Sequence, residues 1–249
     1  MIREYHSWHS PILNREMELL TFGDSGARVI VFPTSCGRFY DWENREMIKA
    51  LSHHIDQGWI QVFCVDSVDR ESWWNLSAHP KDKASRHLTY QKYVVEEVLP
   101  FTEKKNDNNF VIALGASMGA YHAMSIALRY PLSFHRTIGM SGPYDFEQMS
   151  GPYSVFNWIH DHSDDVVDQC NPSSFIRNAP EEHLAKIRKM DIIFAIGETD
   201  PLFESNRILS EVMAEKKIPH AYRVWDGFAH DWPFWHEMVL HYIGGDGTR

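Results

Sequence analysis

The sequence has no apolar run approaching the roughly 20 residues that a helix needs to cross a lipid bilayer. Residues 1–10 are polar and aromatic, so they lack the basic start and apolar middle of a secretory signal peptide. Both absences predict a soluble protein without a secretory signal.

Cysteine is scarce, since Cys36, Cys64 and Cys170 are the three that the chain contains. An odd number of cysteines at these spacings matches neither a disulfide framework nor a zinc site. This pattern is typical of a reducing environment, and we therefore expect a cytoplasmic protein.

Basic residues are outnumbered, because 24 Lys and Arg stand against 34 Asp and Glu and leave a formal net charge of −10. The basic residues are also scattered along the chain, so the field of the protein repels phosphate backbones and anionic lipids. We expect neither nucleic acid nor membrane as a partner. The sequence leaves the oligomeric state open.

No linker rich in Pro, Gly or Ser divides the chain, and no internal repeat is visible. A length of 249 residues with 43% hydrophobic content is enough to bury one sizeable core. The sequence therefore predicts a single domain over residues 1–249.

Short apolar runs alternate with amphipathic segments. Strands are predicted at 28–32, 59–65, 110–114, 137–140, 192–196 and 221–225, and helices at about 41–57, 89–105, 118–129, 181–190, 203–216 and 232–243. Continuous apolar strands separated by helices indicate fold class α/β, with a mostly parallel central sheet covered by helices on both faces. Residues 17–22, followed by turn residues at 23–26, predict an N-terminal antiparallel hairpin at one edge.

The segment at about 147–178 breaks this alternation. It is too long for an ordinary connection between a strand and a helix. We expect it to be a cap-like insertion over the functional site.

The strongest local motif is Gly-Ala-Ser-Met-Gly at residues 115–119, where an apolar strand ends and a helix begins. A nucleophile on such a sharp turn has a strained backbone, and side chains two positions either side would collide, so glycine is needed there. The free N–H groups at the start of the helix point toward the place where an oxyanion forms. Ser117 is therefore the candidate nucleophile.

Serine needs a base to become a nucleophile at neutral pH, and in this architecture the base follows the last strand. Of the 15 histidines, His230 occupies that place, in a loop between the last predicted strand and the final helix. His122, within the helix that follows Ser117, and His236, on a later helix, are expected to be packing residues.

A buried carboxylate must hold the base in the correct tautomer. Asp200 follows the predicted strand 192–196. The chain order Ser, Asp, His is the order found where the nucleophilic serine stands on a strand-to-helix turn of an α/β fold. Glu198 is a rival for this role, and Asp226, which directly follows the next strand, is a weaker one.

Two backbone amides are expected to form an oxyanion hole. The first is the N–H of Met118, and the second comes from loop 33–37, where Ser35 is our choice and Cys36 the alternative. Because these donors belong to the main chain, the identity of their side chains matters little.

Aromatic residues are candidates for lining a substrate pocket. Trp73 and Trp74 follow a strand at the sheet end where ligands bind in open α/β folds, and Tyr144 and Trp158 are similar candidates, with plain packing the alternative for all four. His160, Asp161 and His162 carry side chains capable of binding metal, but their spacing fixes no tetrahedral set. We expect a solvated loop there and no metal site.

The whole chain resembles the esterase branch of the α/β-hydrolase superfamily, which includes esterase D-like enzymes (S-formylglutathione hydrolases), feruloyl and acetylxylan esterases, and bacterial mycolyltransferases. The resemblance is carried by the 115–119 motif with Ala120, by Gly197-x-x-Asp200, and by Gly227-x-x-His230-x-Trp232-x-x-Trp235. The chain lacks the His-Gly-Gly-Gly loop of the hormone-sensitive lipase branch, which argues against that group.

The resemblance implies a serine carboxylesterase that forms an acyl-enzyme on Ser117 and needs no cofactor. A small-molecule ester is the expected substrate. Two alternatives remain: an acyltransferase with the same triad, and a catalytically silent member of the fold that binds a ligand or protein.

Overall fold

The first predicted strand forms β3 (Ala27–Phe32) in the computed structural model of the chain, which describes residues 1–148 and 165–244. Successive side chains of a strand point to opposite faces of the sheet. Accordingly Ile30 and Phe32 pack into one hydrophobic cluster, whereas Val29 and Val31 pack into another. Because both faces are buried, the run is apolar throughout.

The sheet has eight strands in the order β1-β2-β4-β3-β5-β6-β7-β8. The other strands are β1 (Arg3–Ser10), β2 (Arg15–Phe22), β4 (Ile60–Val65), β5 (Val111–Ala116), β6 (Arg136–Met140), β7 (Asp191–Gly197) and β8 (Ala221–Trp225). Strands β1 and β2 pair antiparallel, as do β2 and β4, and every other neighbouring pair is parallel. This arrangement confirms the predicted α/β-hydrolase fold with its N-terminal hairpin.

The hairpin turns at residues 11–14, between β1 and β2. The predicted turn at 23–26 instead carries the chain from β2 past β4 to β3, because β4 lies between those two strands. A carboxylate attaches the hairpin to the body of the protein: Glu97 accepts hydrogen bonds from the indole of Trp8 at 2.8 Å and from the hydroxyl of Ser10 at 2.7 Å.

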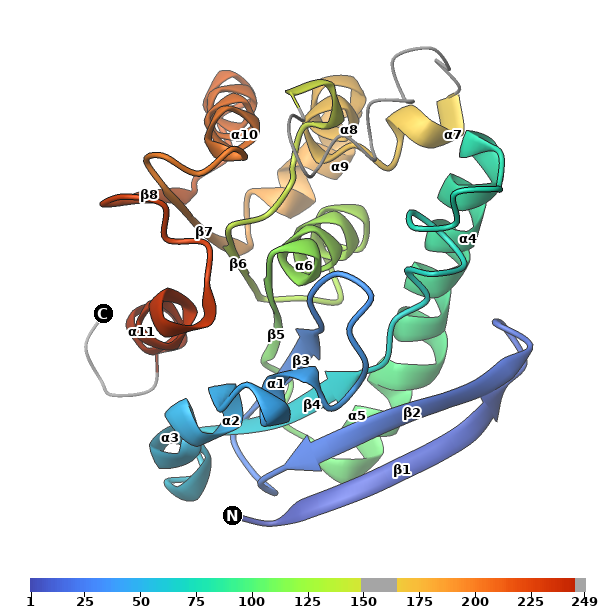
Figure 1. Cartoon of the computed structure of the whole chain (residues 1–249), viewed down its shortest axis with the longest axis vertical. Helices are drawn as coiled ribbons and strands as arrows, with labels where there is room; N and C mark the ends of the chain where they lie inside the picture. Colours follow the sequence, from blue (N-terminus) through green and yellow to red (C-terminus); the bar gives the residue numbers. More distant parts are fainter. Residues whose placement is uncertain (149–164, 245–249) are drawn as a thin grey trace.

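Helices cover both faces of the sheet (Figure 1). One face carries α1 (Asp41–Asn44), α2 (Met47–Ala50), α3 (Ser52–Asp56) and α11 (Trp232–Tyr242). The opposite face carries α4 (Pro80–Tyr93), the π-helix η1 (Val94–Val98), α5 (Leu99–Lys105), α6 (Met118–Arg129), α8 (Pro172–Asn178), α9 (Glu181–Ile187) and α10 (Phe203–Glu215). Two short helices, η2 (Phe146–Gln148) and α7 (Asp165–Asp168), lie directly before and directly after the undescribed residues 149–164.

Two predicted helices differ from the structure. Segment 41–57 is divided into three short helices, and the break after the first coincides with Glu46 in the left-handed region at φ 61°. The helix predicted at 89–105 begins earlier, at Pro80, and contains η1. Pro100, just after η1, has no N–H to give to an α-helical hydrogen bond, which fits a change of helix type at that point.

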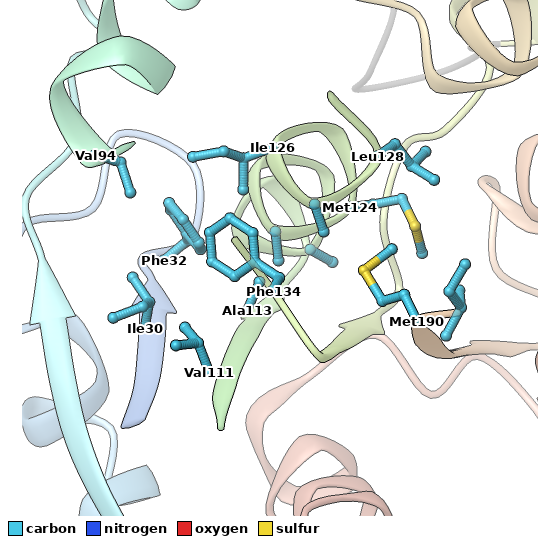
Figure 2. Packing of buried hydrophobic residues seen from close by; sticks show 14 of the residues in the cluster. Ile30, Phe32, Val94, Val111, Ala113, Met124, Ile126, Leu128, Phe134 and Met190 are labelled. Carbon is cyan, nitrogen blue, oxygen red and sulfur yellow. The ribbon is translucent and has the colours of Figure 1, made fainter. Parts of the chain in front are cut away.

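The larger core cluster lies between the sheet and α6. Figure 2 shows Ile126 of α6 beside Phe32 of β3, and Met124 and Leu128 of the same helix on the side of Met190. Burying a side chain the size of Leu or Phe contributes about 1.5–3 kcal/mol, so this packing fixes α6 firmly on the sheet. The start of that helix, where Ser117 stands, is thereby fixed as well.

The predicted insertion at 147–178 is described in part. Its described end packs on the domain, because the Tyr121 hydroxyl of α6 donates to the carbonyl of Cys170 at 2.9 Å, and Ser173 donates to the carbonyl of Tyr144. The rest of the insertion lies outside the described residues. No helix within residues 1–148 and 165–244 is long and apolar enough to span a bilayer.

Stability is expected to fall at mildly acidic pH because of His87. Burial lowers the pKa of this imidazole well below its ordinary value of 6.5, so the folded protein binds fewer protons than the unfolded chain. The stabilisation is complete above the unfolded pKa and is lost as the pH falls below it, by up to about 1.4 kcal/mol per pH unit. We expect His87→Gln to flatten the decline between pH 7 and pH 5 in urea unfolding, whereas His9→Gln, at an exposed position, leaves it unchanged.

Candidate active site

Ser117 stands between β5 and α6 in a backbone conformation that side chains rarely adopt. Its φ is 53° and its ψ −123°, and its N–H donates to the carbonyl of Met140 at 2.8 Å. Residues held with positive φ cluster at functional sites, where the surrounding structure enforces them. The turn is thus held from the neighbouring strand β6, and Ser117 keeps 8% of its surface exposed.

Glycine is required on both sides of this turn. A Cβ atom at Gly115 would lie 2.1 Å from the backbone of Gly119, and one at Gly119 would lie 2.3 Å from the carbonyl oxygen of Phe32. Side chains at these positions would push strand, helix and the loop after β3 apart. The sequence-based explanation of the spacing is confirmed by these contacts.

The three side chains singled out in the sequence meet at one edge of the sheet. His230 Nε2 lies 3.1 Å from Ser117 Oγ, and His230 Nδ1 lies 2.7 Å from Asp200 Oδ2. An ionised carboxylate only accepts hydrogen bonds, so the imidazole proton is assigned to Nδ1. Nε2 is then the acceptor that faces the serine hydroxyl.

The loops that carry Asp200 and His230 are in direct contact. Asp200 is 3% exposed, and its second oxygen accepts the N–H of Leu202 at 2.9 Å, which fixes the carboxylate. A Cβ atom at Gly197 would lie 2.1 Å from the carbonyl oxygen of Phe228. The chain can therefore bring Asp200 to His230 only with glycine at 197.

The rival carboxylates lie elsewhere. Glu198 is exposed and accepts the N–H of Gly227 at 3.2 Å, and Asp226 is exposed as well. Of the three candidate acids, Asp200 has the hydrogen bond to the imidazole of His230.

Two further residues support the His230 loop: Trp235, which the sequence motif contains without a role, and Ser141, which sequence reasoning missed. The indole of Trp235 donates to Ser141 Oγ at 3.1 Å, and Ser141 Oγ donates to the carbonyl of Ala229 at 3.2 Å. Trp235 also meets the His230 ring edge to face, with centroids 5.4 Å apart. The signal for Ser141 was its place directly after a strand, but nothing in the sequence assigned it to this loop.

The loop after β3 holds two of its amides in hydrogen bonds to carboxylates. The Thr34 N–H donates to Asp41 at 2.9 Å, and the Cys36 N–H donates to Asp69 at 2.9 Å. Burial also raises the pKa of the Cys36 thiol, which disfavours the nucleophilic thiolate form.

The Ser35 N–H is the amide of this loop that has no partner within residues 1–148 and 165–244. Pro33 has no N–H, and the Gly37 N–H donates to the carbonyl of Thr34 at 2.8 Å. In the same described part of the chain the Met118 N–H, at the first position of α6, also has none. First-turn amides of a helix lack intrahelical acceptors, which accounts for the free Met118 N–H. The N–H groups of Ser35 and Met118 are thus both available to bind a ligand.

The predicted pocket aromatics have different fates. Trp73 and Tyr144 are 0% exposed and belong to hydrophobic clusters, in which Tyr144 packs edge to face on Phe194. A ligand-lining role is therefore not supported for either side chain in this conformation. Packing, the alternative reading, describes both. Trp74 is half-buried and packs against the hydrophobic cluster that contains Trp73 and Tyr121. Trp158 lies outside the described residues.

Metal-binding side chains do not gather in the described part of the chain. No group of three or more His, Cys, Asp or Glu suited to a metal ion occurs in residues 1–148 and 165–244. His160, Asp161 and His162 fall in the undescribed segment. His236 is bonded to the carbonyl of Arg45, and His122 is buried beside Asp69, so neither contacts the Ser117 hydroxyl.

Comparison with known proteins supports a single family. A family model described as "Putative esterase" matches residues 37–241. A curated relative, an acetyl esterase from Caldicellulosiruptor saccharolyticus, is 22% identical over 176 residues; the match covers 64% of this chain and 64% of the relative, less than two thirds of its length.

Two solved structures share the architecture over nearly the whole chain. A ferulic acid esterase superposes with a TM-score of 0.74 at 16% identity, covering 97% of this chain and 96% of its own. An S-formylglutathione hydrolase from Agrobacterium tumefaciens gives 0.75 at 16% identity, covering 97% and 92%. At such low identity these likenesses establish the fold.

Replacing Gly119 by alanine is expected to destabilise the protein. The new methyl group would meet the Phe32 carbonyl at 2.3 Å, and overpacking of this kind costs about 1–3 kcal/mol. Urea unfolding measures the loss. A free energy of unfolding equal to that of the parent would show that the loop after β3 does not press on α6.

Proposed function

Because the chain belongs to this esterase family, we propose that it hydrolyses a carboxylic ester with Ser117 as nucleophile, His230 as general base and Asp200 as the acid that orients the base. One observation carries the proposal: the hydrogen-bonded series from Ser117 Oγ through both imidazole nitrogens to Asp200, with distances of 3.1 and 2.7 Å. Distances in this range allow proton transfer from hydroxyl to imidazole.

The first half-reaction forms an acyl-enzyme. Ser117 Oγ attacks the ester carbonyl carbon while His230 Nε2 takes the hydroxyl proton, and the carbonyl oxygen becomes an oxyanion. Asp200 stabilises the imidazolium that results. His230 then gives this proton to the departing alcohol, and the bond between the carbonyl carbon and the alcohol oxygen breaks.

The second half-reaction uses the same groups with water. His230 removes a proton from the water as its oxygen adds to the acyl carbon, and a second oxyanion forms. When this intermediate collapses, the proton returns to Ser117 Oγ and the carboxylic acid leaves. Apart from the ester and one water molecule, the cycle uses only side chains and amides of the protein.

The oxyanion is stabilised in both steps by the amides of Ser35 and Met118. Both N–H groups are free in the described structure, and Gly119 brings their two segments into contact. Preorganised donors of this kind contribute strongly, since removal of one costs about 10²–10³ in kcat in other enzymes.

The substrate is a small-molecule ester. The similar proteins are named as an acetyl esterase, a ferulic acid esterase and an S-formylglutathione hydrolase, and the substrates in these names differ widely in size. The triad alone therefore does not select the acyl and alcohol groups of the ester. Trp74 and the insertion at 147–178, as a cap over the site, are the segments that we propose to select them.

Ser117→Ala should abolish hydrolysis of p-nitrophenyl acetate. Without the hydroxyl no acyl-enzyme forms, and kcat should fall by at least about 10⁴-fold. Stopped assays on the purified variant measure this, and a fluorophosphonate probe should label the parent protein but not the variant. Undiminished turnover in Ser117→Ala would remove the basis of the proposal.

Asp200→Asn should lower kcat by about 10³- to 10⁴-fold, because an amide facing Nδ1 favours the wrong tautomer of His230. Glu198→Gln is the matched control, two residues away on the same loop and exposed, and should keep activity within about threefold. Equal losses in the two variants would mean that Asp200 is not the acid. Adding acceptor alcohols to the same assay distinguishes acyl transfer, which would give new ester products.

A further inference from the structure

Asp69 is a buried carboxylate that the proposed reaction does not use. It lies four residues beyond β4 and is 1% exposed. One oxygen accepts the Cys36 N–H at 2.9 Å, and the other lies 2.8 Å from His122 Nε2. Burying a carboxylate is costly unless it is well hydrogen-bonded, and these two contacts give a partner to each oxygen. The two partners belong to two separate segments, the loop after β3 and α6.

The first contact fixes the peptide next to Ser35. Cys36 has φ of 54°, in the left-handed region where a residue with a side chain is strained. Its N–H is held by Asp69, and the N–H and hydroxyl of Thr34 are held by Asp41, both at 2.9 Å. Because the backbone has only two soft dihedrals per residue, holding the neighbours on both sides sets the direction of the Ser35 N–H.

The second contact reaches the helix that carries the other amide. His122 is 2% exposed and lies on α6, five residues after Ser117. A carboxylate that binds His122 and Cys36 at once therefore couples the loop after β3 to α6. The two amides proposed for the oxyanion hole, those of Ser35 and Met118, belong to these two segments.

We propose that Asp69 is a positioning residue of the oxyanion hole: it holds the strained Cys36 peptide and ties it through His122 to α6, which sets the Ser35 amide relative to that of Met118. The inference rests on the proposed function of Ser117. A displacement of about 1 Å in a catalytic group costs about 10²-fold in rate, so the effect of Asp69 should appear in kcat.

Asp66 provides a matched control. It is equally buried, at 0% exposure, and directly follows β4. Its carboxylate accepts from Arg38 Nε at 2.7 Å and from the Ser67 N–H at 3.0 Å. The amides of Thr34 and Cys36 are instead held by Asp41 and Asp69. Replacing it tests the loss of a buried charge near the loop without loss of the bond to Cys36.

The experiment compares Asp69→Leu, Asp69→Asn and Asp66→Asn with the parent in p-nitrophenyl acetate hydrolysis. The leucine variant has no acceptor for the Cys36 N–H, so its kcat should fall about 100-fold with KM within about threefold. The asparagine variant retains an oxygen acceptor and should stay within about tenfold of the parent. Asp66→Asn should keep kcat within about threefold, and thermal unfolding verifies that each variant is folded.

A second readout separates positioning from general stability. A trifluoromethyl ketone forms a hemiketal oxyanion on the serine, so its inhibition constant should rise about 100-fold in Asp69→Leu and little in Asp66→Asn. Equal kcat and equal inhibition in the Asp69→Leu and Asp66→Asn variants would overturn the inference. Should Asp69→Leu fail to fold, His122→Leu removes the donor from α6, and a kcat equal to the parent's would overturn it too.

Failure of the proposed function would look different. If Ser117→Ala keeps the activity of the parent, the hydrolysis does not use Ser117, whatever the Asp69 variants do. If Ser117→Ala is inactive and Asp69→Leu is fully active, the proposed nucleophile stands and the positioning role falls.

Discussion

Close backbone contact at the turn after β5 is the constraint on which the rest of the site depends. Ser117 can hold its positive φ only because strand, helix and the loop after β3 meet there without side chains at Gly115 and Gly119. The packing of α6 on the sheet and the bond from the Ser117 N–H to Met140 keep that turn closed. Ser117 and the Met118 amide take their positions from it, and the loop that carries Ser35 packs against it.

Much of this could be predicted from the sequence, for physical reasons. Strands buried on both faces are apolar throughout, and parallel strands end at one edge of the sheet, so residues after β5, β7 and β8 must gather there. Those rules place Ser117, Asp200 and His230 without knowledge of any contact. The choice of Asp200 over Glu198 followed from position alone, and the distance of 2.7 Å to His230 agrees with it.

Other features depend on contacts between distant segments, which one sequence does not record. Asp69 and His122 are 53 residues apart and look like an ordinary loop carboxylate and an ordinary helix histidine until the fold joins them. Trp73 and Tyr144 were candidates for the pocket because residue type does not distinguish an aromatic side chain that lines a pocket from one buried in the core, where both in fact lie. The left-handed residue at Glu46, which interrupts a predicted helix, likewise has no signature in local propensity.

The loops that end β7 and β8 touch at Gly197 and Phe228 with no room for a single added carbon. Two segments in such contact constrain each other, since a side chain added at Gly197 would clash with the backbone of its neighbour. A substitution that reshapes one of them is tolerated only with a compensating change in its neighbour. In evolution, residues 197–200 and 227–230 should consequently vary as a pair, while the segments that shape the substrate's surroundings remain free to diverge.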